Sequence, residues 1–489
     1  MATRNRVFYQ SEALFVAPSG VQSEKGGLPT VADQALQAAG KQFVTQIQRV
    51  QSINYSFEVA RTDVNQFGQL AAIDRIIVEQ PTVSLDFTYY PTTGSEESGM
   101  GFKLGTGISA VSSLIDGKRD VNSYFVFTSP EGKDANLDYS TIRTEDAGDD
   151  GFTGDTGGSA SNPATTSAAS DDEKGVVGVL GFGNAFMTSY SAEAAVGEFV
   201  SATVNCEALN MTFDSDTDSI NNPTVSTTSG ALVTHGDGDG GGLPGKSISL
   251  DGDNFQPTSG GVDQPVALRH GDISLHNPAT TAGLITSWDD IVSGHQFNDM
   301  KVQNFSFSFD LAREDLQKIG SKFAFAKLIE FPATATLDVS AVVGVMTASD
   351  GKNDTTTAGW GGATEKNPIF GVHQYVTNDA EKASLAILCH KPNTTNIASN
   401  EADLASHALR ANVAMYYAIH GAKLDSQSFS SSIGDSKTVD MSFSTQIGGP
   451  TDTANGIRIA TSKGSTLPAG TALEYGDRMA NGGKGLHLP

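Results

Sequence analysis

The chain has 489 residues, of which 38% are hydrophobic and 8% aromatic, and it contains 53 glycines. This length is enough for roughly two to four domains, each with its own hydrophobic core. The formal net charge of -25 argues against a surface that grips nucleic acid through clustered Lys and Arg, and equally against docking on an anionic membrane.

The cysteine content and the N-terminal sequence argue against disulfide-rich, zinc-binding, secreted and membrane proteins. Cys206 and Cys389 are too few for a disulfide framework or a zinc site, and each lies in an apolar segment that predicts a small core residue. The N-terminal sequence has no apolar core long enough for a signal peptide, and no apolar stretch has the length of a membrane-spanning helix. We therefore expect a soluble protein that is made in the cytoplasm.

The first clear element is "INYSFEVARTD", from Ile53 to Asp63, where apolar and polar residues alternate as in a strand with one core face. "DVNQFGQ" follows and predicts one helical turn ended by Gly68. After "AAIDRIIVE", Pro81 marks a strand boundary, because proline cannot donate to a sheet ladder. The next strand has an apolar phase made of Val83, Leu85, Phe87 and Tyr89.

Two further strand patterns complete this half. "VNSYFVFTSPEG" predicts a short apolar strand, and "TSYSAEAAVGEFVSATVNCE" predicts two strands joined by a turn at Gly197. Residues 144–175 are rich in Asp, Gly, Ser and Thr, which predicts an acidic insertion that buries little. Residues 214–245 have a similar composition and predict a linker.

One segment in this region matches a nucleotide-binding pattern. "GGGLPGKS", residues 240–247, has the letters of a phosphate-binding loop. That loop must open a helix, but "SISLDGDN" follows here and alternates like a strand, and "THGDGDG" before it would repel a triphosphate. We interpret the segment as part of the linker, and a nucleotide enzyme as the weaker alternative.

The same order of patterns then returns. "FSFSFDLARED", from Phe305 to Asp315, repeats the first strand together with its Ala-Arg-x-Asp ending, and "FAFAKLIEF", Pro332 and a second alternating strand follow. "KASLAILCHKPN" and "LDSQSFSSSIGDSKTVDMSF" repeat the later strands. A period this long predicts a duplicated domain rather than a solenoid.

The duplication sets the predicted organisation. We expect two tandem, related domains, residues 1–245 with a repeat core at 50–213 and residues 246–489 with a repeat core at 302–446, followed by a C-terminal arm over 470–489. The fold class is mainly β: two β-sandwich or barrel-forming domains, each with one short helix, plus long loops rich in Gly, Asp, Ser and Thr.

No catalytic or metal-binding pattern has a convincing setting. All nine histidines lie from His235 onwards, so the two repeat cores share no histidine site, and Asp214, Asp216 and Asp218 lack the Gly and Glu of a calcium loop. We expect no enzyme activity, cofactor or metal. The candidate interface residues are the repeated pairs Arg61, Asp63, Arg313 and Asp315, which are either solvated turn residues or an ion pair that each copy uses once in an assembled ring.

The run "RVQSINYSFEVARTDVNQFGQLAAIDRIIVEQPTVSLDFTYYP", with the later "TSYSAEAAVGEFVSATVNCEALNM", resembles the major tail (tail tube) proteins of long-tailed bacteriophages. The second half repeats this pattern in a more degenerate form. The resemblance implies self-assembly into stacked rings whose inward strands form a hollow tube, through which the phage genome passes without specific binding. It also implies a place in the virion tail and other tail proteins as partners at the tube ends.

Charge and duplication fit that expectation. An acidic wall would repel DNA and so reduce friction in the lumen, and three two-domain chains would give a pseudo-sixfold ring. Two alternatives remain: another virion component, such as a capsid decoration or fibre-base protein, and a carbohydrate-binding or hydrolytic β-sandwich. The last class favours clustered exposed Trp, and this chain has only Trp288 and Trp360.

Overall fold

The structure is a computed structural model, and part of the chain is described here. The described residues are 12–18, 42–43, 45–77, 80–91, 94–104, 109–116, 120–128, 178–214, 223–225, 248–249, 268, 273–277, 295–296, 300–320, 323–324, 326–343, 383–390, 413–432, 436–449, 452 and 455–460. The predicted insertion at 144–175, the phosphate-loop match at 240–247, the domain boundary near 245 and the C-terminal arm at 470–489 lie outside them.

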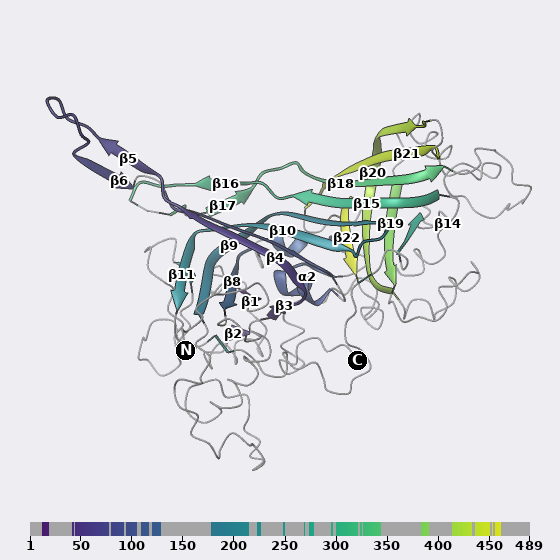
Figure 1. Cartoon of the computed structure of the whole chain (residues 1–489), viewed down its shortest axis with the longest axis horizontal. Helices are drawn as coiled ribbons and strands as arrows, with labels where there is room; N and C mark the ends of the chain where they lie inside the picture. The colour runs from purple at the N-terminus through teal and green to yellow at the C-terminus, as the bar shows by residue number, and fades with distance from the viewer. Residues whose placement is uncertain are drawn as a thin grey trace, which may run out of the picture.

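Antiparallel strands dominate the described residues, which confirms the mainly β fold. The longest continuous layer, here called the central sheet, has the order β4-β7-β10-β9-β15-β18-β21-β20 (Figure 1). Its strands are β4 (Val50–Glu58), β7 (Thr82–Tyr89), β9 (Gly178–Ala195), β10 (Ser201–Ala208), β15 (Met300–Asp310), β18 (Ala333–Val343), β20 (Val413–Ser430) and β21 (Thr438–Ile447). The sheet runs without a break from the first half of the chain into the second.

Two long strands connect the central sheet to a second layer. The N-terminal parts of β9 and β20 leave the central sheet and pair with other strands, so each strand serves two sheets. β9 pairs there with β8 (Asn122–Thr128) and β11 (Asn210–Asp214), and β8 pairs in turn with β1 (Glu12–Pro18), which also pairs with β3 (Thr45–Ile47). β20 pairs with β19 (Ala383–His390) and β22 (Gly456–Ala460), and β19 continues to β13 (Ile273–Asn277) and β14 (His295–Gln296).

The core lies between these two layers. The apolar phase of β7 predicted from the sequence is buried: Val83, Leu85, Phe87 and Tyr89 are each 0% exposed. In the second half, Leu337, Val339 and Ala341 of β18 are buried in the same way. Both cysteines are buried free thiols, as expected. One hydrophobic cluster extends through both halves of the chain, because β9 and β15 join their sheets edge to edge.

Two short helices belong to the first half, α2 (Ser95–Met100) and α3 (Ser112–Ile115). The helical turn expected at residues 63–69 is wrong: this segment is the tip of a hairpin between β5 (Arg61–Val64) and β6 (Asp74–Ile77). Gly68 has a φ of 86°, which suits a turn as well as a helix end, and this explains the error. None of the described helices is long and apolar enough to cross a membrane.

Each half has one such hairpin, formed in the second half by β16 (Arg313–Leu316) and β17 (Ala326–Ile329). The β5–β6 hairpin extends beyond the rest of the molecule, whereas the β16–β17 hairpin lies along the first half's part of the central sheet (Figure 1). Every residue of β5 and β6 is exposed, while β16 and β17 are largely half-buried. The two hairpins therefore have the same pairing but different surroundings.

The predicted linker at 214–245 differs from expectation at one point. Asp214 ends β11, and residues 223–225 pack on β9 rather than staying exposed. Asn184 fixes this segment, because its side-chain amide donates to the carbonyl of Val225 and its amide oxygen accepts from the Val225 N–H. A short polar segment can be buried when its backbone groups find partners in this way.

Candidate assembly interface

The junction between β9 and β15 joins the two halves of the chain. Seven residue pairs run in antiparallel register from Asn304 opposite Ala195 to Asp310 opposite Ser189. The Leu311 N–H donates to the Thr188 carbonyl at 2.7 Å beyond one end, and the Val196 N–H donates to the Gln303 carbonyl at 2.9 Å beyond the other. The junction is therefore a complete sheet ladder with no unpaired backbone inside it.

Aromatic side chains fill the core side of this junction. The rings of Tyr190 and Phe309 stack with centroids 5.6 Å apart, and the Phe307 ring lies 5.6 Å from that of Tyr417. Phe307 is 1% exposed and faces Ala192, which is fully buried. Large rings opposite a small residue give close packing, so the junction resembles a domain interior more than a surface contact.

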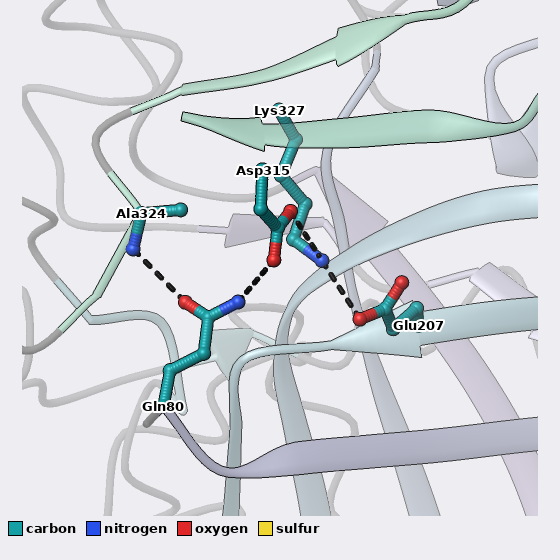
Figure 2. A network of polar contacts seen from close by, with 5 residues as sticks. All are labelled: Gln80, Glu207, Asp315, Ala324 and Lys327. Atoms are coloured by element: carbon teal, nitrogen blue, oxygen red, sulfur yellow. Dashed lines mark hydrogen bonds and ion pairs between the residues drawn. The ribbon is translucent and has the colours of Figure 1, made fainter. Parts of the chain in front are cut away.

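A polar network on the outer side holds the β16–β17 hairpin against the first half (Figure 2). The Lys327 ammonium lies 2.9 Å from a carboxylate oxygen of Glu207 on β10 and 3.0 Å from one of Asp315. Gln80 donates its side-chain amide to Asp315 and accepts the Ala324 N–H at 2.9 Å. The Lys327 side chain is only 2% exposed. A buried ammonium needs such partners, and two carboxylates supply them.

The predicted residues of the second copy both lie at this junction. The Arg313 guanidinium lies over the Phe186 ring, 4.9 Å from its centroid. Burial lowers the pKa of Arg313, and the nearby Asp120 and Cys206 oppose this shift. Asp315 pairs with Lys327 rather than with Arg313. The pair predicted from Arg-x-Asp is thus two separate contacts, with a ring and with an ammonium.

The predicted residues of the first copy are exposed. Arg61 and Asp63 lie on β5, and Asp63 accepts a hydrogen bond from the Arg75 guanidinium at 2.6 Å. Arg75 occupies the position opposite Asp63 in the hairpin, as Lys327 does opposite Asp315. The cation across the hairpin is therefore repeated, and sequence reasoning missed it. A basic residue at the same place in both copies was the available signal.

The partners on the other side of the junction are not repeated. The equivalent bulges in β9 and β20 place Ser444 of β21 where the first half has Glu207 of β10. Phe331 stands before Pro332 as Gln80 stands before Pro81. The second half thus lacks the carboxylate and the amide that hold Lys327 and Asp315, and the polar network belongs to the internal junction alone.

Two edges of the central sheet have no strand beside them in the described part of the chain. One is the outer edge of β4, and the other is the edge of β20 over residues 423–430, which pairs only with β21. Apolar side chains are exposed at both: Tyr55 is 39% exposed, Phe57 49% and Phe429 43%. Exposed edges with apolar residues are templates for pairing with another chain.

The face of the central sheet that points away from the core is polar and acidic. Register with the buried phase places on this face Glu58, Asp86, Glu193, Glu207, Asp310, Asp338 and Asp440. Between them lie Ser, Thr and Asn residues. The basic side chains placed on this face are Lys423 of β20, which precedes a bulge, and Lys327, whose ammonium pairs with Glu207. Carboxylates outnumber them, so the face as a whole disfavours phosphate groups.

Glu97 of α2 has a buried carboxyl that lies in a cluster of tyrosines from both halves of the chain. Tyr89 donates to Glu97 at 2.6 Å and Tyr190 donates to the same oxygen at 3.3 Å, while the Tyr190 and Tyr417 hydroxyls are 3.3 Å apart. Burial, reinforced by the neighbouring Glu96, raises the pKa of Glu97 to about 8. Glu97 is 0% exposed, so a substrate cannot reach it, and we interpret the cluster as structural.

No protein-family model matches the chain, and no curated protein matches it in sequence. Among solved structures, the tail of an empty gene transfer agent particle matches with 9% identity over 37% of this chain and 95% of the other, at a TM-score of 0.21. The sheath/tube terminator of the PVC contractile injection system matches with 11% identity over 41% and 100%, at 0.23. The tube-terminating cap of the anti-feeding prophage matches with 11% identity over 42% and 98%, at 0.21. Similarity at these TM-scores carries no conclusion for this chain.

Proposed function

We propose that the chain is a structural subunit of a phage-type tail tube. Copies would assemble into closed rings that stack into a hollow tube, with the central sheets forming the wall and their acidic faces lining the lumen. The observation that carries the proposal is the central sheet itself: two halves of matching strand order are joined edge to edge, and no described strand covers the edge at either end. Ring closure satisfies both edges at once.

The acidic face supports a role in conducting DNA. The carboxylates on this face, apart from Glu207, which pairs with Lys327, would repel the phosphates of a genome that slides past, so the wall would not retain it. Passage without retention suits a conduit. The chain then acts in the virion tail, with other tail proteins at the ends of the tube, and it needs no catalytic site or cofactor.

The duplication sets the expected ring. If each half is one tube module, a ring of three chains contains six modules in pseudo-sixfold symmetry, with internal and intermolecular junctions alternating around it. The repeated residues Arg61, Asp63, Arg313 and Asp315 would then lie near these junctions, once in each module.

Electron microscopy of the purified protein tests the proposal directly. Hollow tubes or rings with a central opening, in which six similar densities surround the lumen, are the expected result. Spikes, solid fibres or an isolated monomer with an occupied pocket would contradict it. Spikes would favour the capsid decoration or fibre-base alternative.

A further inference from the structure

The junction between β9 and β15 suggests which strands, and which residues in them, would pair between two copies of the chain. We propose that the edge of β4, which has no partner strand among the described residues, pairs antiparallel with the similarly uncovered edge of β20 of a second copy, in the register of the internal junction. The inference rests on the proposed function for its biological meaning, but the two free edges and the internal junction from which it is argued are independent of that function.

The first argument is that the two halves share their irregularities. A register shift interrupts β4 between Val50 and Ser52, and the same shift interrupts β15 between Val302 and Asn304. β bulges fix which residues face which side, so β4 and β15 present their edges in equivalent phase. Ser52 therefore corresponds to Asn304, and Phe57 to Phe309.

The partner strands correspond in the same way. Thr188 forms a bulge in β9 where this strand meets β10, and Asp425 forms an equivalent bulge in β20 where that strand meets β21. Ser426 in β20 thus takes the place of Ser189 in β9. Transferring the internal register predicts six pairs between copies: Ile53 with Ser431, Asn54 with Ser430, Tyr55 with Phe429, Ser56 with Ser428, Phe57 with Gln427, and Glu58 with Ser426.

The second argument is burial. Phe307 and Phe309 of β15 are each 1% exposed because β9 covers their edge, whereas their counterparts Tyr55 and Phe57 are 39% and 49% exposed. In the predicted register Tyr55 lies opposite Phe429, which is also exposed. The apolar residues left uncovered at the two edges thus meet each other, and cross-strand aromatic pairs stabilise antiparallel sheets.

The third argument is that β20 of the same chain cannot pair with the edge of β4. β4 and β20 stand at opposite ends of the central sheet, with six strands between them in the order given above. A second copy brings a fresh β20 edge to each β4 edge. The contact is heterologous, so it repeats from copy to copy until the array closes.

Disulfide trapping tests the register. Hydrogen-bonded pairs alternate with non-hydrogen-bonded ones in an antiparallel ladder, and the bonds of Leu311 and Val196 place Ser308 and Ser191 in the second class. Their counterparts Ser56 and Ser428 should then have Cα atoms about 4.5 Å apart, which a disulfide can bridge. Both serines are exposed, so cysteine is tolerated, and the buried Cys206, with a pKa raised to about 12, will not compete.

The experiment co-expresses S56C and S428C full-length chains, purifies their assemblies under reducing conditions and then oxidises them. A covalent dimer is expected from the mixture and not from either variant alone. Pairing S56C with S426C or S430C, each two residues out of register, should reduce the yield at least tenfold. A chain that carries both S56C and S428C should give a closed covalent ring, whose size on a denaturing gel counts the chains.

The outcomes distinguish a failure of the predicted strand pairing from a failure of the proposed function. Absence of the S56C–S428C product in particles that microscopy shows to be tubes overturns the register and leaves the tube role standing. Covalent rings that never stack into tubes support the pairing and overturn the tube role. A doubly substituted chain that oxidises within itself and migrates as a monomer refutes the intermolecular pairing.

Discussion

At the scale of single residues, one position in the two hairpins shows how burial affects the contribution of an ion pair to stability. Lys327 and Arg75 stand at the same place, each facing an Asp across the hairpin. Lys327 is 2% exposed and contacts two carboxylates, whereas the Arg75–Asp63 pair is 67% and 48% exposed. The sequence alone gives no reason to rank them, because the difference comes from Glu207 and Gln80 on other strands.

Alanine substitution at the two positions should separate these effects. K327A removes the cation between Asp315 and Glu207 and should lower the free energy of unfolding by about 2 kcal/mol, reduced from the value of a fully buried pair because both carboxylates keep some solvent contact. R75A should cost less than about 0.5 kcal/mol. Urea unfolding of both variants measures the difference, and equal losses would contradict the role assigned to the network.

Glu97 gives the second residue-scale prediction, a dependence of stability on pH. Its pKa is about 8 in the folded protein and near the ordinary value of 4.5 when unfolded, so the folded state holds the proton more tightly. Its contribution to stability is complete below about pH 4.5 and falls by about 1.4 kcal/mol per pH unit up to about pH 8.

Comparison with E97Q isolates this contribution, since glutamine keeps the size of the neutral acid and cannot ionise. The stability of the wild type relative to E97Q should fall as pH rises from 5 to 8 and level off above that. Urea midpoints at four pH values measure it. A constant difference across this range would show that Glu97 is ionised in the folded state.

At the scale of elements, the strands were predictable and their environments were not. Alternation located β4, β7, β15 and β18, and the Gly197 turn located the β9–β10 hairpin. The same alternation predicts a core face for both β4 and β15, yet Tyr55 is exposed and Phe307 is buried. The cause lies in sheet order, because β15 has a strand on each side and β4 ends the sheet.

The candidate interface was predictable to a similar degree. The repeated Arg-x-Asp marked two equivalent positions, but it predicted neither the hairpins in which they lie nor the partners of their charges. Whether these residues serve an assembled ring stays a prediction. The packing of residues 223–225 on β9 was also beyond sequence reasoning, since an Asp- and Thr-rich segment gives no sign of burial.

Gly183 allows a test of that packing. A Cβ on Gly183 would lie 2.0 Å from the carbonyl oxygen of Pro223, which is backbone and has little freedom to move. G183A should therefore destabilise the protein by about 2–3 kcal/mol, or displace residues 223–225 from β9. Gly449 has no atom near its Cβ position and is the matched control, expected to change stability by less than about 0.5 kcal/mol. Thermal unfolding and limited proteolysis measure the two outcomes.

At the scale of the whole molecule, the structure shows where part of the net charge of -25 lies. Part of it lies on one face of the central sheet, where carboxylates alternate with Ser, Thr and Asn. Composition predicted repulsion of DNA but gave no direction to it. The register of the strands supplies that direction, since all seven carboxylates share the side opposite the core.

Reversing the charge on this face should create retention of DNA. Tubes assembled from a D310K/D338K chain are expected to bind double-stranded DNA at low salt and to release it as salt increases, because phosphate contacts exchange with counterions. Wild-type tubes and a D310N/D338N control, which lacks the added cations, should bind none. Gel shift at several salt concentrations measures this, and binding by the wild type would argue against an acidic lumen.

The joining of two unlike halves in one polypeptide affects how sequence changes would be distributed over the proposed ring. If the chain forms the proposed ring, a substitution in one half would recur at every second module around it and never at adjacent ones. Surface features can thus evolve on alternate modules while the others keep the geometry of the wall. The exterior pattern would then have half the rotational order of the channel that it surrounds.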